Sequence, residues 1–268
     1  MASAIAAPAP KRALIDETRA VLLTRLGIVA VVLLVWEGMA QSGLLYRDVV
    51  PSLFRILREL ASILIDPRFY ADLGVTIGEV SVAIAIGGVA GIATGIALGR
   101  SRFLQQAYEP FLHYLGPTPK IIFFPIMIMW FGVGPGSKIA MGALSSFFPV
   151  AISVAGAMRE IDQVLIRVGL SFRLNSWQMI RHIYLPAMRA PVINGIRIGL
   201  GVAIIGTLLA ETKLANQGLG YAVIQTYATF NMPRMYALLI VVFILAVGVN
   251  TVLGRYTERR SARAGAGR

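Results

Sequence analysis

Residues 73–99 read LGVTIGEVSVAIAIGGVAGIATGIALG, a stretch of 27 residues in which Glu79 is the single charge. Because about 20 apolar residues in a helix cross the hydrocarbon core of a bilayer, this stretch predicts a transmembrane helix. Further runs with at most one charge lie at 26–45, 121–137, 139–158, 190–210 and 235–254. We therefore predict an all-α integral membrane protein with about six transmembrane helices.

The composition agrees with this class. Hydrophobic residues make up 57% of the 268 residues and charged residues 14%, and the mean hydropathy is +0.73. In soluble domains about a quarter of the residues are charged. The absence of cysteine excludes disulfides, iron–sulfur clusters and thiol catalysis, and two isolated histidines make a zinc site improbable. The net charge of +12 is explained by loops that anchor helices in a membrane, so no nucleic-acid partner is expected.

The basic residues predict which loops face the cytoplasm. If the N-terminus is cytoplasmic, 17 Lys and Arg residues lie inside and 7 outside, a bias that places both termini inside. The predicted parts are a cytoplasmic segment at 1–25, a first membrane helix at 26–45, an outer amphipathic helix at 46–72, a core of five membrane helices at 73–255 and a basic cytoplasmic tail at 256–268. In the outer segment, apolar residues recur at helical spacing and acidic residues balance the arginines.

The longest cytoplasmic connection, 159–190, has the pattern of two short helices. Asn175 and Gln178 have the spacing of a capping box, which predicts a helix that begins there and stops before Pro186. Its apolar face comprises Trp177, Ile180, Ile183 and Tyr184. This face has to meet the membrane domain of the same chain, the lipid surface or a soluble partner, and the pattern alone leaves the three open.

Small and helix-breaking residues mark two further features of the core. Gly87, Gly91, Gly95 and Gly99 repeat at every fourth position, as do Gly195, Gly199 and Ala203. Such rows favour close packing within one subunit, and a dimer or gating contact is the alternative. The third predicted span is broken by prolines, which favours a pathway-lining helix over a merely interrupted one. The pathway candidates are Pro119, Pro125, Trp130, Gly199 and Glu211.

Charged residues within the spans are few. Glu37, Glu79 and Glu211 lie near predicted outer ends and Arg197 near an inner end, so interfacial anchoring or one structural ion pair is favoured. None of the four lysines follows a glycine, so the chain has no Gly-Lys phosphate loop and is not expected to hydrolyse ATP. The metalloprotease and serine-hydrolase motifs are also absent, and no enzymatic activity is expected.

The stretch from Arg167 to Pro186, followed by a glycine-rich span, resembles the EAA loop of ABC importer permeases, specifically the nitrate/sulfonate/taurine (bicarbonate) class of binding-protein-dependent subunits. The family pattern is E-A-A, three residues, Gly, nine residues and I-x-L-P. Anchored on Ile183, Leu185 and Pro186, it places the triplet on Arg167, Val168 and Gly169 and the glycine on Arg173. The end of the pattern matches, whereas arginine replaces both the acidic residue and the glycine.

Other motifs extend the resemblance over most of the chain after residue 45. They are Val50-Pro51-Ser52, Pro117-x-Pro119 to Trp130-Phe131-Gly132-x-Gly134, Phe147-Phe148-Pro149, and Ala210-Glu211 leading to Gly218-Leu219-Gly220-Tyr221. The resemblance implies a type I ABC importer permease fold in a bacterial inner membrane. Two copies would form the pathway by alternating access, with cytoplasmic ABC ATPase subunits that bind the ATP and a periplasmic solute-binding protein. The substrate would be a small anion or small organic nutrient.

The same resemblance assigns residues to surfaces. The ATPase-coupling loop would comprise Arg167, Val168, Gly169, Arg173, Asn175, Trp177, Ile180, Arg181, Ile183, Leu185 and Pro186. The surface that faces the binding protein would include Arg55, Arg58, Gly218 and Tyr221. An ion-gradient-driven secondary transporter is the alternative, but the chain lacks acidic residues at midspan and a clear inverted repeat. A lipid-modifying enzyme would have only Glu211 with Lys213, without a nucleophile beside them.

Overall fold

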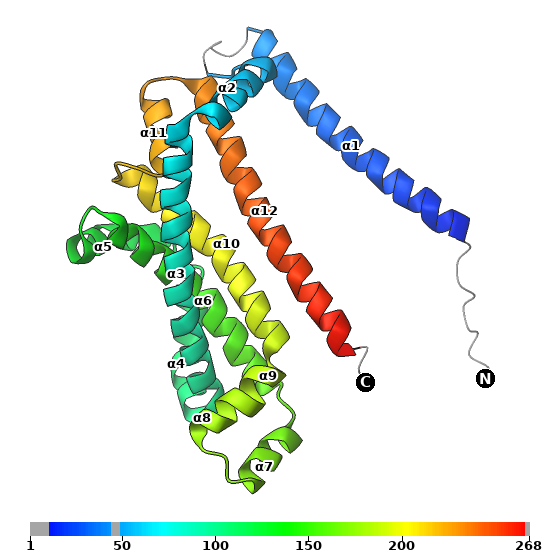
Figure 1. The fold of residues 1–268 in the computed structure, drawn as a ribbon, viewed down its shortest axis with the longest axis vertical. Helices are drawn as coiled ribbons and strands as arrows, with labels where there is room; N and C mark the ends of the chain where they lie inside the picture. Colours follow the sequence, from blue (N-terminus) through cyan, green and yellow to red (C-terminus); the bar gives the residue numbers. More distant parts are fainter. Residues whose placement is uncertain (1–10, 44–48, 266–268) are drawn as a thin grey trace.

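The computed structural model describes residues 11–43 and 49–265, and within these ranges the chain forms helices and no strand (Figure 1). The long helices are α1 (Lys11–Gln41), α3 (Pro67–Arg100), α6 (Pro135–Arg159), α10 (Arg189–Lys213) and α12 (Met232–Gly265). The shorter ones are α2 (Leu53–Ile65), α4 (Arg102–Leu115), η1 (Lys120–Phe123), α5 (Phe124–Phe131), α7 (Gln163–Ser171), α8 (Ser176–Met179), η2 (Ile180–Tyr184), α9 (Leu185–Ala187) and α11 (Leu219–Ala228). The predicted all-α class is confirmed.

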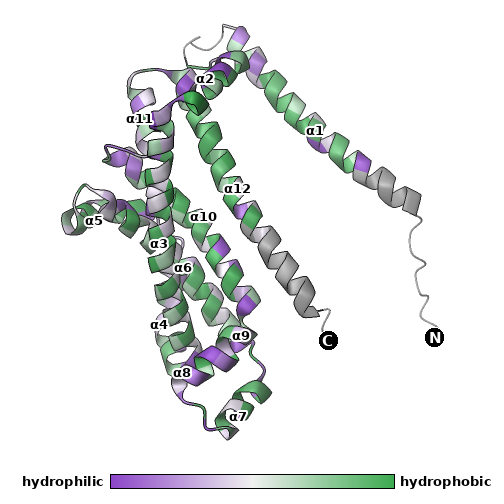
Figure 2. Ribbon diagram, in the orientation of Figure 1, coloured by the Kyte–Doolittle hydropathy of each residue, from purple (hydrophilic) through white to green (hydrophobic). Residues whose placement is uncertain are grey.

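The number of membrane spans agrees with the sequence. Among the described residues, five helices are long and apolar enough to cross a bilayer, or six if α4 and the η1–α5 segment form one span bent by 96°. Figure 2 shows hydrophilic residues mainly at the two ends of the bundle, around α2 and α11 at one end and α8 and α9 at the other. The predicted ends 1–25 and 256–268 fall partly outside the described residues, while 11–25 and 256–265 continue α1 and α12.

The third span differs from the prediction. Residues 121–137 do not form one helix of membrane length, because η1 begins after Pro119, α5 carries Pro125 in its first turn, and Gly132 ends α5 with φ of 75°. A proline lacks the N–H that a helix interior needs and is tolerated in the first turn, so each proline here starts a new short segment. Only together with the preceding helix α4 does this segment have the length and apolar composition of a membrane span.

The centre of the bundle consists of α3, α6 and α10, held together by the glycine rows. A Cβ atom on Gly91 would lie 2.9 Å from the Phe147 carbonyl oxygen, and one on Gly95 would lie 2.6 Å from the Val154 Cβ. A Cβ on Gly199 of α10 would lie 2.8 Å from a methyl group of Val150. The rows therefore bring backbones together within one subunit, as the sequence predicted.

Helix α2 and the C-terminal end of α1 form a cap on the core. The apolar face of α2 buries Ile56 and Ile63 in a cluster with residues of α11 and α12, and the predicted amphipathic helix is thus shorter than 46–72, since α3 begins at Pro67. The Glu37 carboxylate of α1 accepts a 2.9 Å hydrogen bond from the Leu53 N–H. Beyond this anchor α1 diverges from the bundle, and none of its membrane-length window is buried (Figure 1).

Candidate functional site

The segment 159–190 lies at the end of the bundle remote from α2 and α11 (Figure 1). The predicted capping box is confirmed: the Gln178 N–H donates to the Asn175 side-chain oxygen and the Asn175 N–H donates to the Gln178 side-chain oxygen, both at 2.8 Å. The predicted stop before Pro186 is wrong. Helix α8 passes without a break into the π-helical turn η2 and then α9, so the helix runs on through Pro186.

The turn between α7 and α8 fits the proposed register. Arg173, the residue aligned with the family glycine, has a φ of 50°, a backbone region that glycine adopts with less strain. The Leu174 N–H donates to the Gly169 carbonyl oxygen at 3.1 Å, which closes the end of α7. A Cβ on Gly169 would come 2.5 Å from the Met179 sulfur, so a larger residue here would displace the Met179 side chain.

One side of the segment is packed on the membrane core. Met179, Tyr184 and Met188 are buried in a cluster with residues of α3 and α6, and Ile180, Ile183 and Leu185 pack against it. The Arg100 guanidinium of α3 lies 6.0 Å from the centre of the Tyr184 ring and donates to the Ser176 hydroxyl at 3.4 Å. The sequence pattern left three possible contacts for the apolar face. Most of this face packs on the membrane domain of the same chain.

The other side of the segment is exposed. Trp177 is 66% exposed, and Phe172 and Leu170 are also exposed apolar side chains. The predicted coupling residues divide accordingly: Arg167, Val168, Arg173, Asn175, Trp177 and Arg181 are exposed, Gly169 is buried, and Ile180, Ile183, Leu185 and Pro186 are half-buried. The exposed residues form a surface of mixed apolar and basic side chains. The opposite side of the segment packs on the membrane core.

At the opposite end, Glu211 organises a buried polar network. Its side chain is 0% exposed. One carboxylate oxygen accepts from the Thr76 hydroxyl at 2.7 Å and the other from the Gly220 N–H at 2.6 Å, and the Thr76 hydroxyl accepts from the Leu219 N–H at 2.8 Å. A Cβ on Gly218, whose φ is 108°, would lie 2.6 Å from the Glu211 carboxyl carbon. The backbone of the Gly218-Leu219-Gly220 motif thus folds closely around the Glu211 carboxylate.

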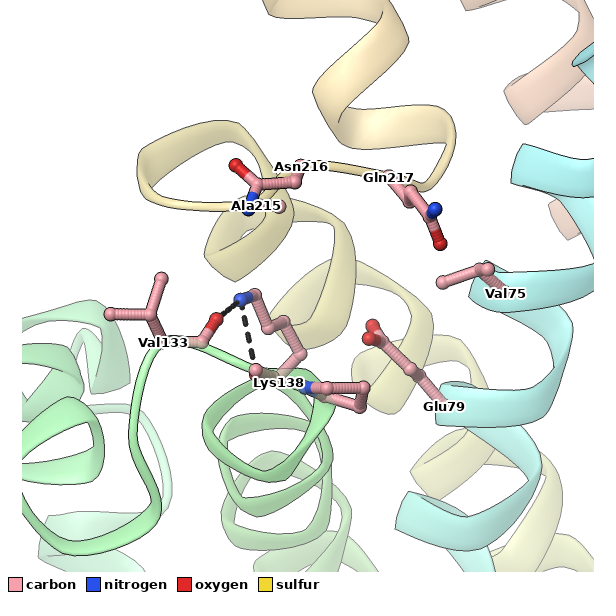
Figure 3. A pocket seen from close by; sticks show the side chains of 9 residues that line it. Val75, Glu79, Val133, Lys138, Ala215, Asn216 and Gln217 are labelled. Carbon is pink, nitrogen blue, oxygen red and sulfur yellow. Dashed lines mark hydrogen bonds between the residues drawn. The ribbon is translucent and has the colours of Figure 1, made fainter.

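A cavity of about 320 Å³ opens beside this network, between α3, the start of α6 and the loop after α10 (Figure 3). Glu79 and Lys138 project into it, and Asn216 and Gln217 line it from the loop. The Lys138 ammonium, 3% exposed, donates to the carbonyl oxygens of Val133 and Gly134. It also interacts electrostatically with the carboxyl groups of Glu79 and Glu211.

Glu79, which lines this cavity, has one carboxylate oxygen, Oε2, that no hydrogen-bond donor reaches in the described residues. It is 6% exposed, and its carboxyl group interacts directly with the carboxyl group of Glu211. The sequence had placed Glu79 and Glu211 near water, whereas the structure buries both. Lys138 was not a candidate at all. Its position, two residues after a Gly-Pro-Gly turn and one turn into a span, was the available signal for a buried lysine.

The predicted pathway residues do not gather around one cavity within the described part of the chain. Pro119, Pro125 and Trp130 are exposed on the η1–α5 segment, which protrudes from the bundle (Figure 1). Gly199 is buried in the contact of α10 with α6, and Glu211 lies in the network described above. Of the residues predicted to face a binding protein, Arg55 and Arg58 are exposed on α2, Tyr221 is half-buried and Gly218 is buried.

An ion pair at the end of the bundle that carries α2 fixes the cap on the core, and its carboxylate, Asp66, lies outside the membrane spans. The Arg234 guanidinium of α12 donates to the Asp66 carboxylate at 2.7 Å, at the corner between α2 and α3. This bond and the N–H of Arg68 hold the pKa of the Asp66 carboxyl below its ordinary value. In the described residues no group of three or more metal-ligating side chains is present.

The multi-span bundle is that of an integral membrane protein, and a broken span such as α4–α5 is common in transporters. Residues 87–262 match the family of binding-protein-dependent transport system inner membrane components. This match spans about two thirds of the sequence, so the chain belongs to that family. It is a permease subunit of a binding-protein-dependent importer and is not itself an enzyme, which sets aside the secondary-transporter and lipid-enzyme alternatives.

Similar proteins and structures agree with this assignment. The taurine transport system permease protein TauC of Escherichia coli (strain K12) is 29% identical over 87% of this chain and 88% of that protein. The putative aliphatic sulfonates transport permease protein SsuC of Bacillus subtilis (strain 168) is 27% identical over 79% of this chain and 77% of that protein. An inward-facing structure of the MetNI methionine ABC transporter superposes with a TM-score of 0.62, 20% identity and coverage of 77% of this chain and 96% of that chain. The type I ABC importer permease fold is therefore confirmed.

Proposed function

We propose that this chain is the membrane-spanning half of an ATP-driven importer for a small sulfonate or a related anion or organic nutrient. Two copies would form the pathway, two cytoplasmic ABC ATPase subunits would bind the segments 159–190, and a periplasmic solute-binding protein would deliver the substrate. The names of the taurine and aliphatic-sulfonate relatives support the substrate class. The chain would carry no cofactor, because the ATP is bound by the partner subunits.

The observation that carries the proposal is the two-sided construction of segment 159–190. The side that faces the membrane core, with Met179 and Tyr184, is buried against α3 and α6. Trp177 and Arg181 are exposed on the opposite side. An ATPase that closes on the exposed side would move the segment as one body. It would thereby displace the ends of α3 and α6 against which the segment packs. A loop without a packed inner face could not transmit this displacement.

The second copy is supported by the α5 segment. Met129 is 83% exposed and Trp130 is 72% exposed on a helix that protrudes from the bundle. A patch of large apolar side chains on a protruding element suits contact with another membrane helix, and a symmetric pair of such contacts would enclose a pathway that one chain does not. We therefore propose a homodimer, with Pro119, Pro125 and Trp130 at or near the pathway.

The orientation follows from the same proposal. The start of α1 points away from the end of the molecule that carries α2, and the end of α12 lies toward the end that carries α7, α8 and α9 (Figure 1). If ATPases bind that end, both termini are cytoplasmic, in agreement with the charge bias. Arg55 and Arg58 on α2 would then face the periplasm and the binding protein.

The test is assembly of full-length variants with the ATPase. The chain, purified gently from its native membrane, should bring down one soluble nucleotide-binding subunit per permease and show ATP hydrolysis that a periplasmic binding protein stimulates. We expect Trp177→Ala and Arg181→Glu to reduce the recovered ATPase at least tenfold while insertion stays normal. Matched controls on the outer face are Phe54→Ala and Arg58→Glu, which should leave recovery unchanged. Normal recovery with both Trp177→Ala and Arg181→Glu would refute the docking surface.

A further inference from the structure

An apolar groove with a volume of about 390 Å³ lies between α3 and the segment 159–190. Val89, Ala93 and Ala97 line it from α3, and Trp177 and Leu185 line it from the segment. Ala93 and Ala97 are exposed, and their small side chains, one helical turn apart, leave room between the larger residues. Val89 is 70% exposed, so the groove is open to the surroundings of the bundle.

The α3 side of the groove has about the length of one leaflet of a bilayer. Val89 and Arg100 both line the groove, and the eleven residues from one to the other give a rise of about 16 Å at about 1.5 Å per residue. One leaflet contributes half of a hydrocarbon core of about 30 Å. Because α3 is long and apolar enough to span a membrane and ends at Arg100, the groove runs from the hydrocarbon core toward the level of the lipid headgroups.

Arg100 lies where the groove reaches the end of α3, and no carboxylate pairs with it in the described residues. Within the same residues its guanidinium makes one hydrogen bond, to the Ser176 hydroxyl at 3.4 Å, and it lies 6.0 Å from the centre of the Tyr184 ring. A guanidinium has five N–H donors, so four remain for an anion. The indole of Trp177 at the same end is apolar with one N–H donor, which suits the boundary between hydrocarbon and headgroups.

The stretches that build the groove are basic. Residues 80–108 and 163–210 carry seven arginines and no Asp or Glu. The acidic residues next to these stretches at this end of the bundle are already engaged, since Glu109 pairs with Arg159 at 2.8 Å and Asp162 caps α7. The end of the groove at α8 therefore attracts an anionic group, while its walls favour a hydrocarbon chain.

A phospholipid fits both properties better than a protein does. A second copy placed face to face would set Arg100 against its own counterpart, because a two-fold contact pairs identical surfaces. A soluble ATPase could cover the end at Trp177 but would not reach the wall at Val89 within the hydrocarbon. An anionic phospholipid places its phosphate on Arg100 and one acyl chain along Ala93 and Ala97.

We propose that this groove binds an anionic phospholipid, with the phosphate on Arg100 and Trp177 and an acyl chain along the α3 wall. The bound lipid would contact α3 and the segment 159–190 at once, at the place where Arg100 joins them. The inference goes beyond the proposed importer function and does not depend on it.

The test uses Trp177 as the reporter, because a bromine atom on an acyl chain quenches the fluorescence of an indole that it contacts. The full-length chain has three tryptophans, so Trp36 and Trp130 are replaced by phenylalanine. The chain is reconstituted in phosphatidylcholine vesicles with increasing proportions of brominated phosphatidylglycerol or brominated phosphatidylcholine, and the quenching gives the relative affinity of the two lipids. We expect phosphatidylglycerol to be preferred about fivefold or more, the ratio that one arginine near anionic lipid provides.

Two pairs of variants separate a built site from general attraction to a basic surface. Arg100→Gln should abolish the preference, whereas Arg102→Gln, an exposed arginine that does not line the groove, should keep it. Ala93→Phe fills the groove without changing a charge and should also abolish the preference. Ala85→Phe, at an exposed position of α3 outside the groove, is its control and should keep the preference.

Ala93→Phe also covers the case in which Arg100→Gln fails to fold, because it adds an apolar group at an exposed position of a membrane helix. Equal quenching by both lipids in the starting chain, an unchanged preference in Arg100→Gln, or a preference that survives in Ala93→Phe would each overturn the assignment. Displacement of brominated phosphatidylglycerol by inorganic phosphate at constant ionic strength would show a site for the free anion and would also overturn it. Since no ATPase or binding protein is present, these results leave the importer function to its own test.

Discussion

The carboxylate of Glu211 should be the most sensitive single group for the stability of the outer end of the bundle. Replacement by alanine removes the acceptor for the Thr76 hydroxyl and the Gly220 N–H, which lie 2.7 and 2.6 Å from it. Hydrogen bonds to a charged group contribute roughly 1.5–3 kcal/mol each, so two of them predict a loss of about 3–6 kcal/mol for Glu211→Ala. Glutamine has one acceptor oxygen in place of two, so it can keep only one of these two hydrogen bonds and should lose about half as much.

The assay is the denaturation midpoint of the purified full-length chain in detergent micelles, at one protein and detergent concentration. The matched control is Glu160→Ala, an exposed carboxylate, which should change stability by less than about 0.5 kcal/mol. The expected order is unmodified chain and control first, then Glu211→Gln, then Glu211→Ala. If Glu211→Ala is as stable as the control, the carboxylate does not hold the 218–220 loop and the reasoning is refuted.

Two other positions allow similar tests. Replacement of Arg173, which has a φ of 50°, by glycine relieves backbone strain and should stabilise the α7–α8 turn by up to about 1 kcal/mol, seen as slower amide exchange around it; faster exchange would contradict this. Because the folded pKa of Asp66 is lowered, its ion pair with Arg234 stabilises the fold above the unfolded pKa of about 3.9, and this contribution is lost as the pH falls through the folded value. When the pH is lowered from about 6 to about 3, the free energy of unfolding should therefore fall less for Arg234→Gln than for the unmodified chain. An equal fall in both would refute the link between this ion pair and the pH dependence.

The sequence predicted those features that depend on local pattern. Hydropathy located the membrane helices, the spacing of Asn175 and Gln178 located a helix start, and the four-residue glycine rows indicated helix contacts. The register taken from Ile183, Leu185 and Pro186 placed a glycine-like turn at Arg173, where the backbone does have a positive φ. Each of these signals lies within one helix or one turn, so chain neighbours alone determine it.

The features that the sequence missed depend on the relative placement of separate helices. Glu79, Lys138 and Glu211 lie on α3, α6 and α10, and only the depth at which these helices pack brings the three charges together. The bend between α4 and η1 depends on how the chain turns after Pro119, and the hydropathy of 121–137 does not encode it. Hydropathy also does not distinguish the apolar helices that are buried in the bundle from α5 and α1, which stay exposed on the single chain.

Helix α3 connects the two sites, and its glycine row determines whether they can act together. Its N-terminal half carries Glu79 and its C-terminal end carries Arg100, which contacts Tyr184 of segment 159–190. Between Glu79 and Arg100 the glycine row of α3 packs closely against α6. A displacement at the Arg100 end of α3 should therefore move α3 and α6 together as one body. Gly95→Ala, whose Cβ would meet Val154 at 2.6 Å, should cost about 1–3 kcal/mol of stability and reduce the uptake obtained per ATP hydrolysed. Gly78→Ala, on an exposed position of the same helix, is the control, and equal coupling in both variants would show that α3 and α6 need not move together.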